Sequence, residues 1–171
     1  MKNRNFMYGA LAILMFIILK FWYANSTNSE VFFLLKPTDF FINIITSSTS
    51  IFKQDIGFFN ETLNIIINKS CSGFNFLMIA FLMLIFLALK SKNLSKFTVL
   101  IIPISLFISY LFTVFVNTTR ILFSIYMNHY VGNKFSWMHQ TEGTFVYMSF
   151  LIILYLLVNQ FLTKFRNEKF A

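Results

Sequence analysis

Four long runs of apolar residues, separated by shorter polar stretches, dominate the pattern of the chain. They cover Phe6–Tyr23, Phe74–Leu89, Phe97–Val116 and Phe145–Leu162. A transmembrane helix needs about 20 mostly apolar residues, and the second run reaches that length if it begins near Cys71. A proline inside the third run, Pro103, predicts a kink there. The pattern predicts an all-α fold: a polytopic transmembrane helical bundle with about four spanning helices.

Two further apolar segments are poor candidates for crossing a membrane. Val31–Phe52 contains Lys36, Pro37 and Asp39, and a charge at the bilayer centre costs about 2.5–3.5 kcal/mol. Ile121–Val131 would be about 16 Å long as a helix, whereas the hydrocarbon core is about 30 Å thick. We therefore expect both to be short helices that lie at the interface or pack on the bundle.

The segment between Val31–Phe52 and the second apolar run has no clear periodicity. Ile56–Lys69 alternates imperfectly and could turn at Asn60-Glu61, which predicts a small hairpin. With 171 residues, we expect a single integral membrane domain over residues 1–171. No Ala-x-Ala cleavage site follows the first run, so we interpret that run as a retained signal anchor.

Composition and charge support the membrane assignment. Hydrophobic residues make up 57% and charged residues 12% of the chain, about half the charged fraction of a soluble domain. The net charge is +8, but eight of the fourteen basic residues flank the apolar runs on one predicted side: Lys2, Arg4, Lys90, Lys92, Lys96, Lys164, Arg166 and Lys169. The positive-inside rule then places both termini in the cytoplasm. The expected partner is the lipid bilayer, and no nucleic acid is expected because no basic stripe or stacking module is present.

Three residues, far apart in sequence, form a candidate catalytic set. The chain has one cysteine, Cys71, which excludes an internal disulfide and the common thiolate zinc sites, so no metal or cofactor is expected. Cys71 stands at the predicted start of the second spanning helix, and a helix N-terminus or a nearby cation favours the thiolate form of a cysteine. Arg120 could supply the cation, and His139 could act as base and acid. Four crossings bring all three to the same membrane face.

Each of these residues also has a structural interpretation. A single cysteine is often an inert small hydrophobic residue. Arg120 could extend toward lipid headgroups, and His139, beside Trp137 and Met138, could belong to an interfacial aromatic belt. His129 competes as the histidine, although it lies inside a short apolar segment.

Other polar residues near these positions have simpler roles. Glu142 could orient His139, but we prefer it as a first-turn cap of the last helix. Ser70 or Ser72 could cap the helix after Cys71. Asn75 and Asn117 lie in or beside apolar helices, and we expect them to form hydrogen bonds with neighbouring helices.

The motifs around the three candidate residues resemble those of the exosortase/archaeosortase family of membrane transpeptidases. They are Ser70-Cys71-Ser72-Gly73, Asn117-Thr118-Thr119-Arg120 and His139, in the family's order. The resemblance covers about residues 31–162, and the short chain is similar to the small variants of the exosortase K type. It implies that Cys71 is the nucleophile, His139 the acid/base and Arg120 the third catalytic residue.

The resemblance also implies a function. Such enzymes cleave the C-terminal sorting signal of secreted proteins at the extracytoplasmic face of the bacterial cytoplasmic (inner) membrane, through a thioester with the enzyme. The product is passed to an acceptor amine or hydroxyl, or to water. The alternative is a non-catalytic polytopic membrane subunit for transport or assembly; against transport, the predicted spans carry almost no ionisable residue.

Overall fold

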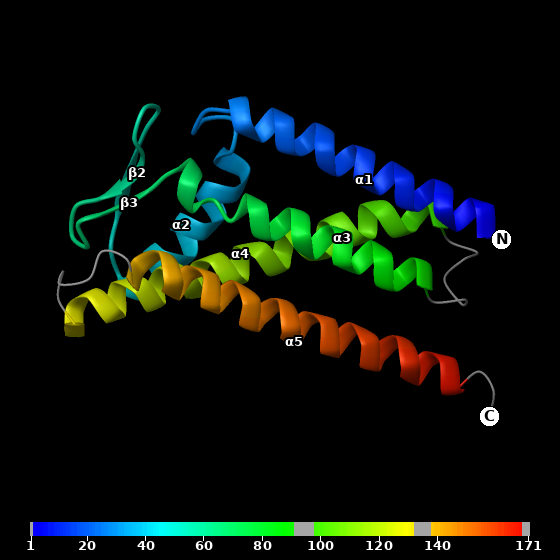
Figure 1. Ribbon diagram of the computed structural model, residues 1–171. Helices are drawn as coiled ribbons and strands as arrows, with labels where there is room; N and C mark the ends of the chain where they lie inside the picture. The colour runs from blue at the N-terminus through cyan, green and yellow to red at the C-terminus, as the bar shows by residue number, and fades with distance from the viewer. Residues whose placement is uncertain (1, 91–97, 132–137, 169–171) are drawn as a thin grey trace.

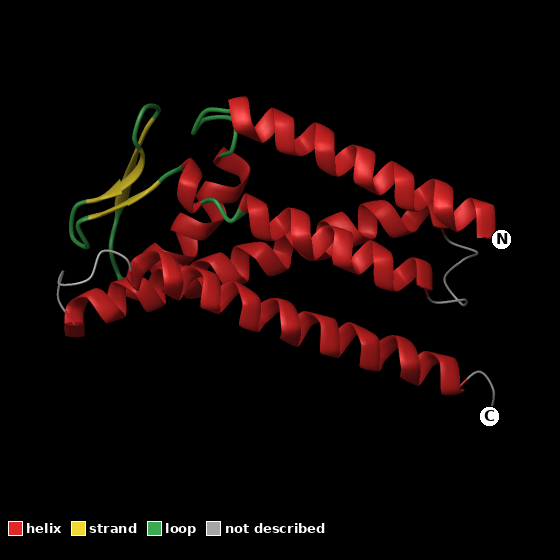
Figure 2. Ribbon diagram, viewed as in Figure 1, coloured by secondary structure: helices red, strands yellow, loops and turns green. Residues whose placement is uncertain are grey.

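The computed structural model describes residues 2–90, 98–131 and 138–168, and it places the side chains of residues 6–90, 100–127 and 143–164. Most of the described chain is helical, with a small sheet at one end (Figures 1 and 2). The elements are α1 (Lys2–Asn25), α2 (Phe32–Thr46), β1 (Ser50–Lys53), β2 (Gly57–Asn60), β3 (Ile65–Ile67), a 3₁₀ turn η1 (Lys69–Cys71), α3 (Phe74–Lys90), α4 (Thr98–Val131) and α5 (Met138–Glu168).

Four of the helices are long and apolar enough to cross a membrane, which confirms the predicted bundle. The candidate spans are Phe6–Asn25, Lys69–Lys90, Leu100–Met127 and Gly143–Lys164. In the most apolar part of the span that contains α3, 61% of the residues are buried, against 6% in the spans of α1 and α5. Helix α3 therefore lies at the centre of the bundle. The outer helices expose large apolar side chains such as Phe6 and Phe145, which suits contact with lipid. The chain is a multi-pass membrane protein.

The two ends of the bundle differ. The N-terminal end of α1, the C-terminal end of α3, the N-terminal end of α4 and the C-terminal end of α5 lie at one end, and the sheet lies at the other (Figure 1). The flanking basic positions that the structure describes, Lys2, Arg4, Lys90, Lys164 and Arg166, therefore belong to the end opposite the sheet. Cys71, which connects the sheet to α3, belongs to the sheet end.

The prediction of a separate short helix at Ile121–Val131 is wrong, because α4 continues without a break to Val131. Its 34 residues correspond to about 51 Å, well beyond a hydrocarbon core of about 30 Å. The polar residues that suggested a helix end bond inside the helix instead: the Thr118 hydroxyl donates to the Val114 carbonyl at 2.8 Å, and Thr119 to Phe115 at 3.0 Å. Arg120 consequently lies within α4, not after it.

Helix α2 is not among the candidate spans and packs against α4, as expected for Val31–Phe52. Its 15 residues are about 22 Å long, too short to cross. Pro37 lies inside this helix and cannot donate to the carbonyl of Phe33, four residues earlier. The hydroxyl of Tyr110 on α4 donates to that carbonyl at 2.9 Å instead, so the neighbouring helix supplies the missing hydrogen bond.

The predicted hairpin is part of a larger three-stranded antiparallel sheet in the order β1-β2-β3 (Figure 2). Residues 61–64 form the turn between β2 and β3, where Asn64 adopts a φ of 51°. The first strand, β1, begins at Ser50, so the prediction of a helix over Val31–Phe52 is wrong for the last residues of that segment. Phe58 and Ile67 are buried with Val31, Leu35 and Ile42, so the sheet packs on α2.

A buried polar cluster joins the sheet to α2. The Asn60 amide is fully buried and donates to Asn43 Oδ1 at 3.0 Å and to the Ser48 hydroxyl at 2.7 Å. Beside it, Asp39 accepts from Asn43 Nδ2 at 2.9 Å through Oδ2, while its Oδ1 has no partner among the described atoms. Burial raises the pKa of the Asp39 carboxyl, against the opposing hydrogen bonds from Ser50 and Asn43.

Candidate active site

Cys71 lies in a tight connection between β3 and α3. Its backbone N–H donates to the Asn68 carbonyl at 2.9 Å, which closes the 3₁₀ turn, and Asn68 Oδ1 accepts from Ser70 N at 3.1 Å. After the turn, the Ser72 hydroxyl accepts from the N–H of Phe74 at 3.3 Å and so caps the start of α3. Of the two serines considered as caps of α3, Ser72 is the one that does this. Cys71 thus precedes the central helix of the bundle by three residues. Its thiol forms no disulfide, and its Sγ lies 3.9 Å from the Ser70 hydroxyl oxygen.

Gly73 allows this connection to pass close to α4. Its φ is +73°, in the left-handed region that favours glycine. A Cβ at this position would lie 3.2 Å from both Asn117 Cγ and Thr113 Cγ2. The start of α3 therefore packs closely against α4 at Gly73.

Arg120 on α4 lines the same cavity as Cys71. The cavity measures about 80 Å³ and is otherwise lined by apolar residues and one serine: Ile65, Ile66, Ile67, Ile121, Ser124 and Ile125. A cationic group in the same cavity as a nucleophile can stabilise an oxyanion that forms there. The structure thus brings together two of the three residues singled out from the sequence, 49 positions apart along the chain.

The guanidinium of Arg120 is held in place from α5. Its Nη1 donates to the Tyr147 hydroxyl at 3.1 Å, and its Cζ lies 5.0 Å from the centre of the Tyr147 ring. A Cβ on Gly143, one turn earlier, would lie 2.5 Å from Arg120 Nε, so the absence of a side chain at Gly143 leaves room for the guanidinium. Tyr147 and Gly143 were not predicted from the sequence, although their spacing of four residues places them on one face of a helix.

A chain of hydrogen bonds links the arginine to the cysteine backbone. The Tyr147 hydroxyl donates to Asn117 Oδ1 at 2.7 Å, and Asn117 Nδ2 donates to the Cys71 carbonyl at 2.6 Å. Asn117 is fully buried. Its predicted interhelical hydrogen bonds are confirmed, and so is that of Asn75, which accepts from Lys20 on α1. Through Asn117 and Tyr147, α4 and α5 fix where the cysteine and the arginine lie relative to each other.

His139 is the second residue of α5, but its side chain lies outside the part that the structure describes. The same holds for the side chains of His129 and Glu142. Helix α5 begins at Met138, seven residues before the predicted start at Phe145. Glu142 is therefore the fifth residue of the helix and does not stand in its first turn.

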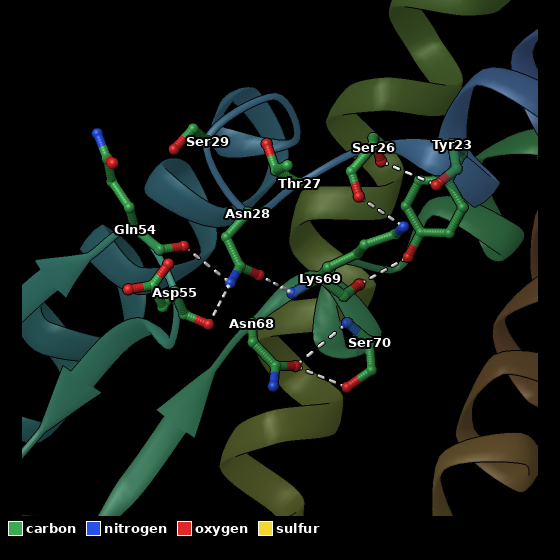
Figure 3. Close-up of a pocket in the computed structure, with 10 residues that line it drawn as sticks. All are labelled: Tyr23, Ser26, Thr27, Asn28, Ser29, Gln54, Asp55, Asn68, Lys69 and Ser70. Atoms are coloured by element: carbon green, nitrogen blue, oxygen red, sulfur yellow. Dashed lines mark hydrogen bonds between the residues drawn. The ribbon is translucent and has the colours of Figure 1, made fainter.

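A larger hollow, of about 810 Å³, lies next to the site between the end of α1 and the sheet (Figure 3). Its polar groups largely bind each other: Lys69 Nζ donates to the Ser26 and Ala24 carbonyls at 2.7 and 3.0 Å, and Asn28 accepts from Lys69 N at 2.8 Å. The Cys71 thiol does not line this hollow. The Tyr23 hydroxyl also donates to the Lys69 carbonyl at 2.6 Å. We therefore interpret these hydrogen bonds as structural contacts that hold η1 against the end of α1.

Within the described residues, no group of three or more His, Cys, Asp or Glu side chains could hold a metal ion. The described part of the site presents a thiol, a guanidinium and hydrogen-bonding side chains.

Comparison with protein families agrees with this class of protein. The chain matches the family model described as transmembrane exosortase (Exosortase_EpsH) over residues 4–156. The match covers most of the 171 residues, and the chain belongs to this family. No curated protein and no solved structure matches the chain.

Proposed function

We propose that this protein is a cysteine transpeptidase that removes the C-terminal sorting signal of secreted proteins at the extracytoplasmic face of the bacterial cytoplasmic membrane. One observation carries the proposal: the single thiol, Cys71, lines the same cavity as Arg120, at the sheet end of the bundle. Family membership supports the same chemistry.

Cys71 is the nucleophile in this proposal, Arg120 stabilises charge, and His139 transfers protons. The assignment of His139 is supported by its position on α5. Residues 139, 143 and 147 are four apart, so the three positions fall within about 80° of one helix face. Two of them, Gly143 and Tyr147, contact Arg120. Position 139 therefore lies on the same face, one turn closer to the sheet end.

The reaction follows from these roles. The Cys71 thiolate attacks the scissile carbonyl carbon, and the resulting oxyanion is stabilised by the Arg120 guanidinium. When the C–N bond breaks, His139 donates a proton to the leaving amine and the acyl group stays on sulfur as a thioester. His139 then accepts a proton from an acceptor amine, hydroxyl or water, which attacks the thioester and releases the thiolate.

Topology supports the extracytoplasmic side. Five of the basic residues that flank the spans, Lys2, Arg4, Lys90, Lys164 and Arg166, lie in described helices at the end opposite the sheet, and the positive-inside rule assigns that end to the cytoplasm. In this orientation, a substrate tail with a hydrophobic helix and basic end would dock beside α1 or α5, whose outer faces are apolar. Docking in the bilayer would hold the cleavage motif near Cys71. It would thereby lower the entropy cost of bringing the scissile bond to the nucleophile.

The test is co-expression with a reporter protein that carries the C-terminal hydrophobic tail of a candidate partner. Cys71→Ala is expected to abolish tail removal without reducing membrane insertion, and Cys71→Ser to leave at most a small residual rate. Full processing by Cys71→Ala would show that the thiol is not the nucleophile. A membrane-impermeant maleimide is expected to label the sole cysteine, Cys71, only from the extracytoplasmic side. Labelling only from the cytoplasm would show that the proposed topology is wrong.

A further inference from the structure

Strand β3 is an edge of the sheet, and its open side faces the candidate active site. In the described part of the chain, β3 pairs with β2 and with no further strand. All three of its residues, Ile65, Ile66 and Ile67, line the cavity that contains Cys71 and Arg120. Successive strand residues point to opposite faces of a sheet, so a cavity lined by three in a row runs along the strand edge.

The backbone of Ile66 points toward this open side. A Cβ at Gly57 on β2 would lie 2.5 Å from the Ile67 carbonyl oxygen, so that carbonyl is directed at β2. In an antiparallel strand, the N–H and C=O of alternate residues point to opposite edges. The N–H and C=O of Ile66, which is opposite Phe59, are therefore directed away from β2.

The edge lacks the usual protection against pairing. Exposed sheet edges commonly carry charged residues, proline or bulges that prevent another strand from adding. Strand β3 reads Ile-Ile-Ile, and 47% of the Ile66 surface is exposed. By contrast, the other edge strand, β1, ends in Lys53.

We propose that β3 binds the extended segment of the substrate that precedes its membrane tail, by adding that segment to the sheet as a fourth strand. This inference rests on the proposed function, because it gives the same site its mode of substrate recognition. Main-chain hydrogen bonds to Ile66 hold the peptide in register, and side-chain pockets select its sequence. The cavity of about 80 Å³ beside Cys71, lined mainly by isoleucine, accepts a small apolar side chain next to the scissile bond.

Two thiol reagents separate strand pairing from thiol reactivity in the full-length protein, purified in detergent. Acetyl-Ala-Val-Ala chloromethyl ketone is an extended peptide electrophile, and the Cys71 thiolate displaces its chloride to form a thioether. Iodoacetamide alkylates the same sulfur, with loss of iodide, but has no strand to pair. Because Cys71 is the only cysteine, the intact mass measures both reactions directly.

Ile66→Pro removes the outward N–H while the hydrogen bonds of β3 to β2 remain. It is expected to slow labelling by the peptide reagent at least fivefold relative to iodoacetamide, the effect of about one net hydrogen bond. Ile66→Ala keeps the N–H and measures how much of that loss belongs to the side chain. A set of peptide reagents, each N-methylated at one amide, tests the wild-type protein independently: at least one is expected to label fivefold more slowly.

Unchanged peptide labelling, both in Ile66→Pro and with every N-methylated reagent, would overturn the pairing and leave the catalytic proposal standing. The pairing would also be wrong if Ile66→Pro changed only the oligomeric state, because the edge would then bind a second copy of the chain. If neither reagent labels Cys71 in the folded wild-type protein, the proposed function and this inference both fail.

Discussion

Replacing Gly143 with alanine would place a methyl group against the guanidinium of Arg120. The new Cβ would lie 2.5 Å from Arg120 Nε and 2.9 Å from Nη2, whereas ordinary contacts begin at 3.4 Å. The contacted atoms are the far end of a flexible side chain, so the guanidinium can move away by about 0.9 Å without a change in the helices. That movement would weaken its hydrogen bond to the Tyr147 hydroxyl.

The expected effect is a loss of rate with little loss of stability. A displacement of about 1 Å in a catalytic group can cost about 100-fold in rate. For stability, the weakened charged hydrogen bond costs about 1.5–3 kcal/mol at most, and alanine in place of glycine returns about 1 kcal/mol of helix propensity. We therefore expect Gly143→Ala to slow tail removal by about 10- to 100-fold while the unfolding temperature changes by only a few degrees.

The assay is the first-order rate of tail loss from a reporter, measured beside the thermal unfolding of the purified variant. Gly9→Ala on α1 is the matched control, because a Cβ there would meet no atom within 4 Å. Gly143→Ala should also add little to the defect of Arg120→Gln, since both act through the guanidinium. A wild-type rate for Gly143→Ala, or two fully additive defects, would refute the idea that the position of this guanidinium governs the reaction.

Three further outcomes follow from the same contacts. Tyr147→Phe keeps the ring but removes the hydroxyl between Arg120 and Asn117; we expect about a tenfold slower rate of tail loss, and an unchanged rate would contradict that link. Asn117→Ala leaves the Cys71 carbonyl without its partner and should lower the unfolding free energy by about 1–3 kcal/mol, measured by chemical denaturation, in addition to slowing the reaction. Because burial raises the pKa of Asp39, its protonated form favours the folded state, so stability should fall as the pH rises from the ordinary carboxyl pKa through the folded-state value. Asp39→Asn should flatten that dependence and raise stability at neutral pH by about 1 kcal/mol, and a steeper dependence of the unfolding temperature on pH would count against this account.

The sequence alone determined the membrane class, the number of spanning helices and two members of the candidate site. An apolar run of about 20 residues is expected to form a transmembrane helix, because a backbone in lipid must form its hydrogen bonds within the protein. The same reasoning correctly kept Val31–Phe52 from crossing. It also singled out Cys71 and Arg120, since a thiol at a helix start and an arginine at the edge of an apolar run are locally visible.

Only the tertiary structure decided how these parts meet. Local polarity at Asn117 to Arg120 suggested a helix end, but the threonine hydroxyls bond to carbonyls within α4 and Asn117 bonds to neighbouring segments, so the helix continues. The hydroxyl of Tyr147 and the missing side chain of Gly143 acquire their roles from the position of Arg120, a contact between two helices. Strand β3 likewise borders the cysteine because η1 and Gly73 turn the chain back toward α4, and three isoleucines in a row could not reveal that.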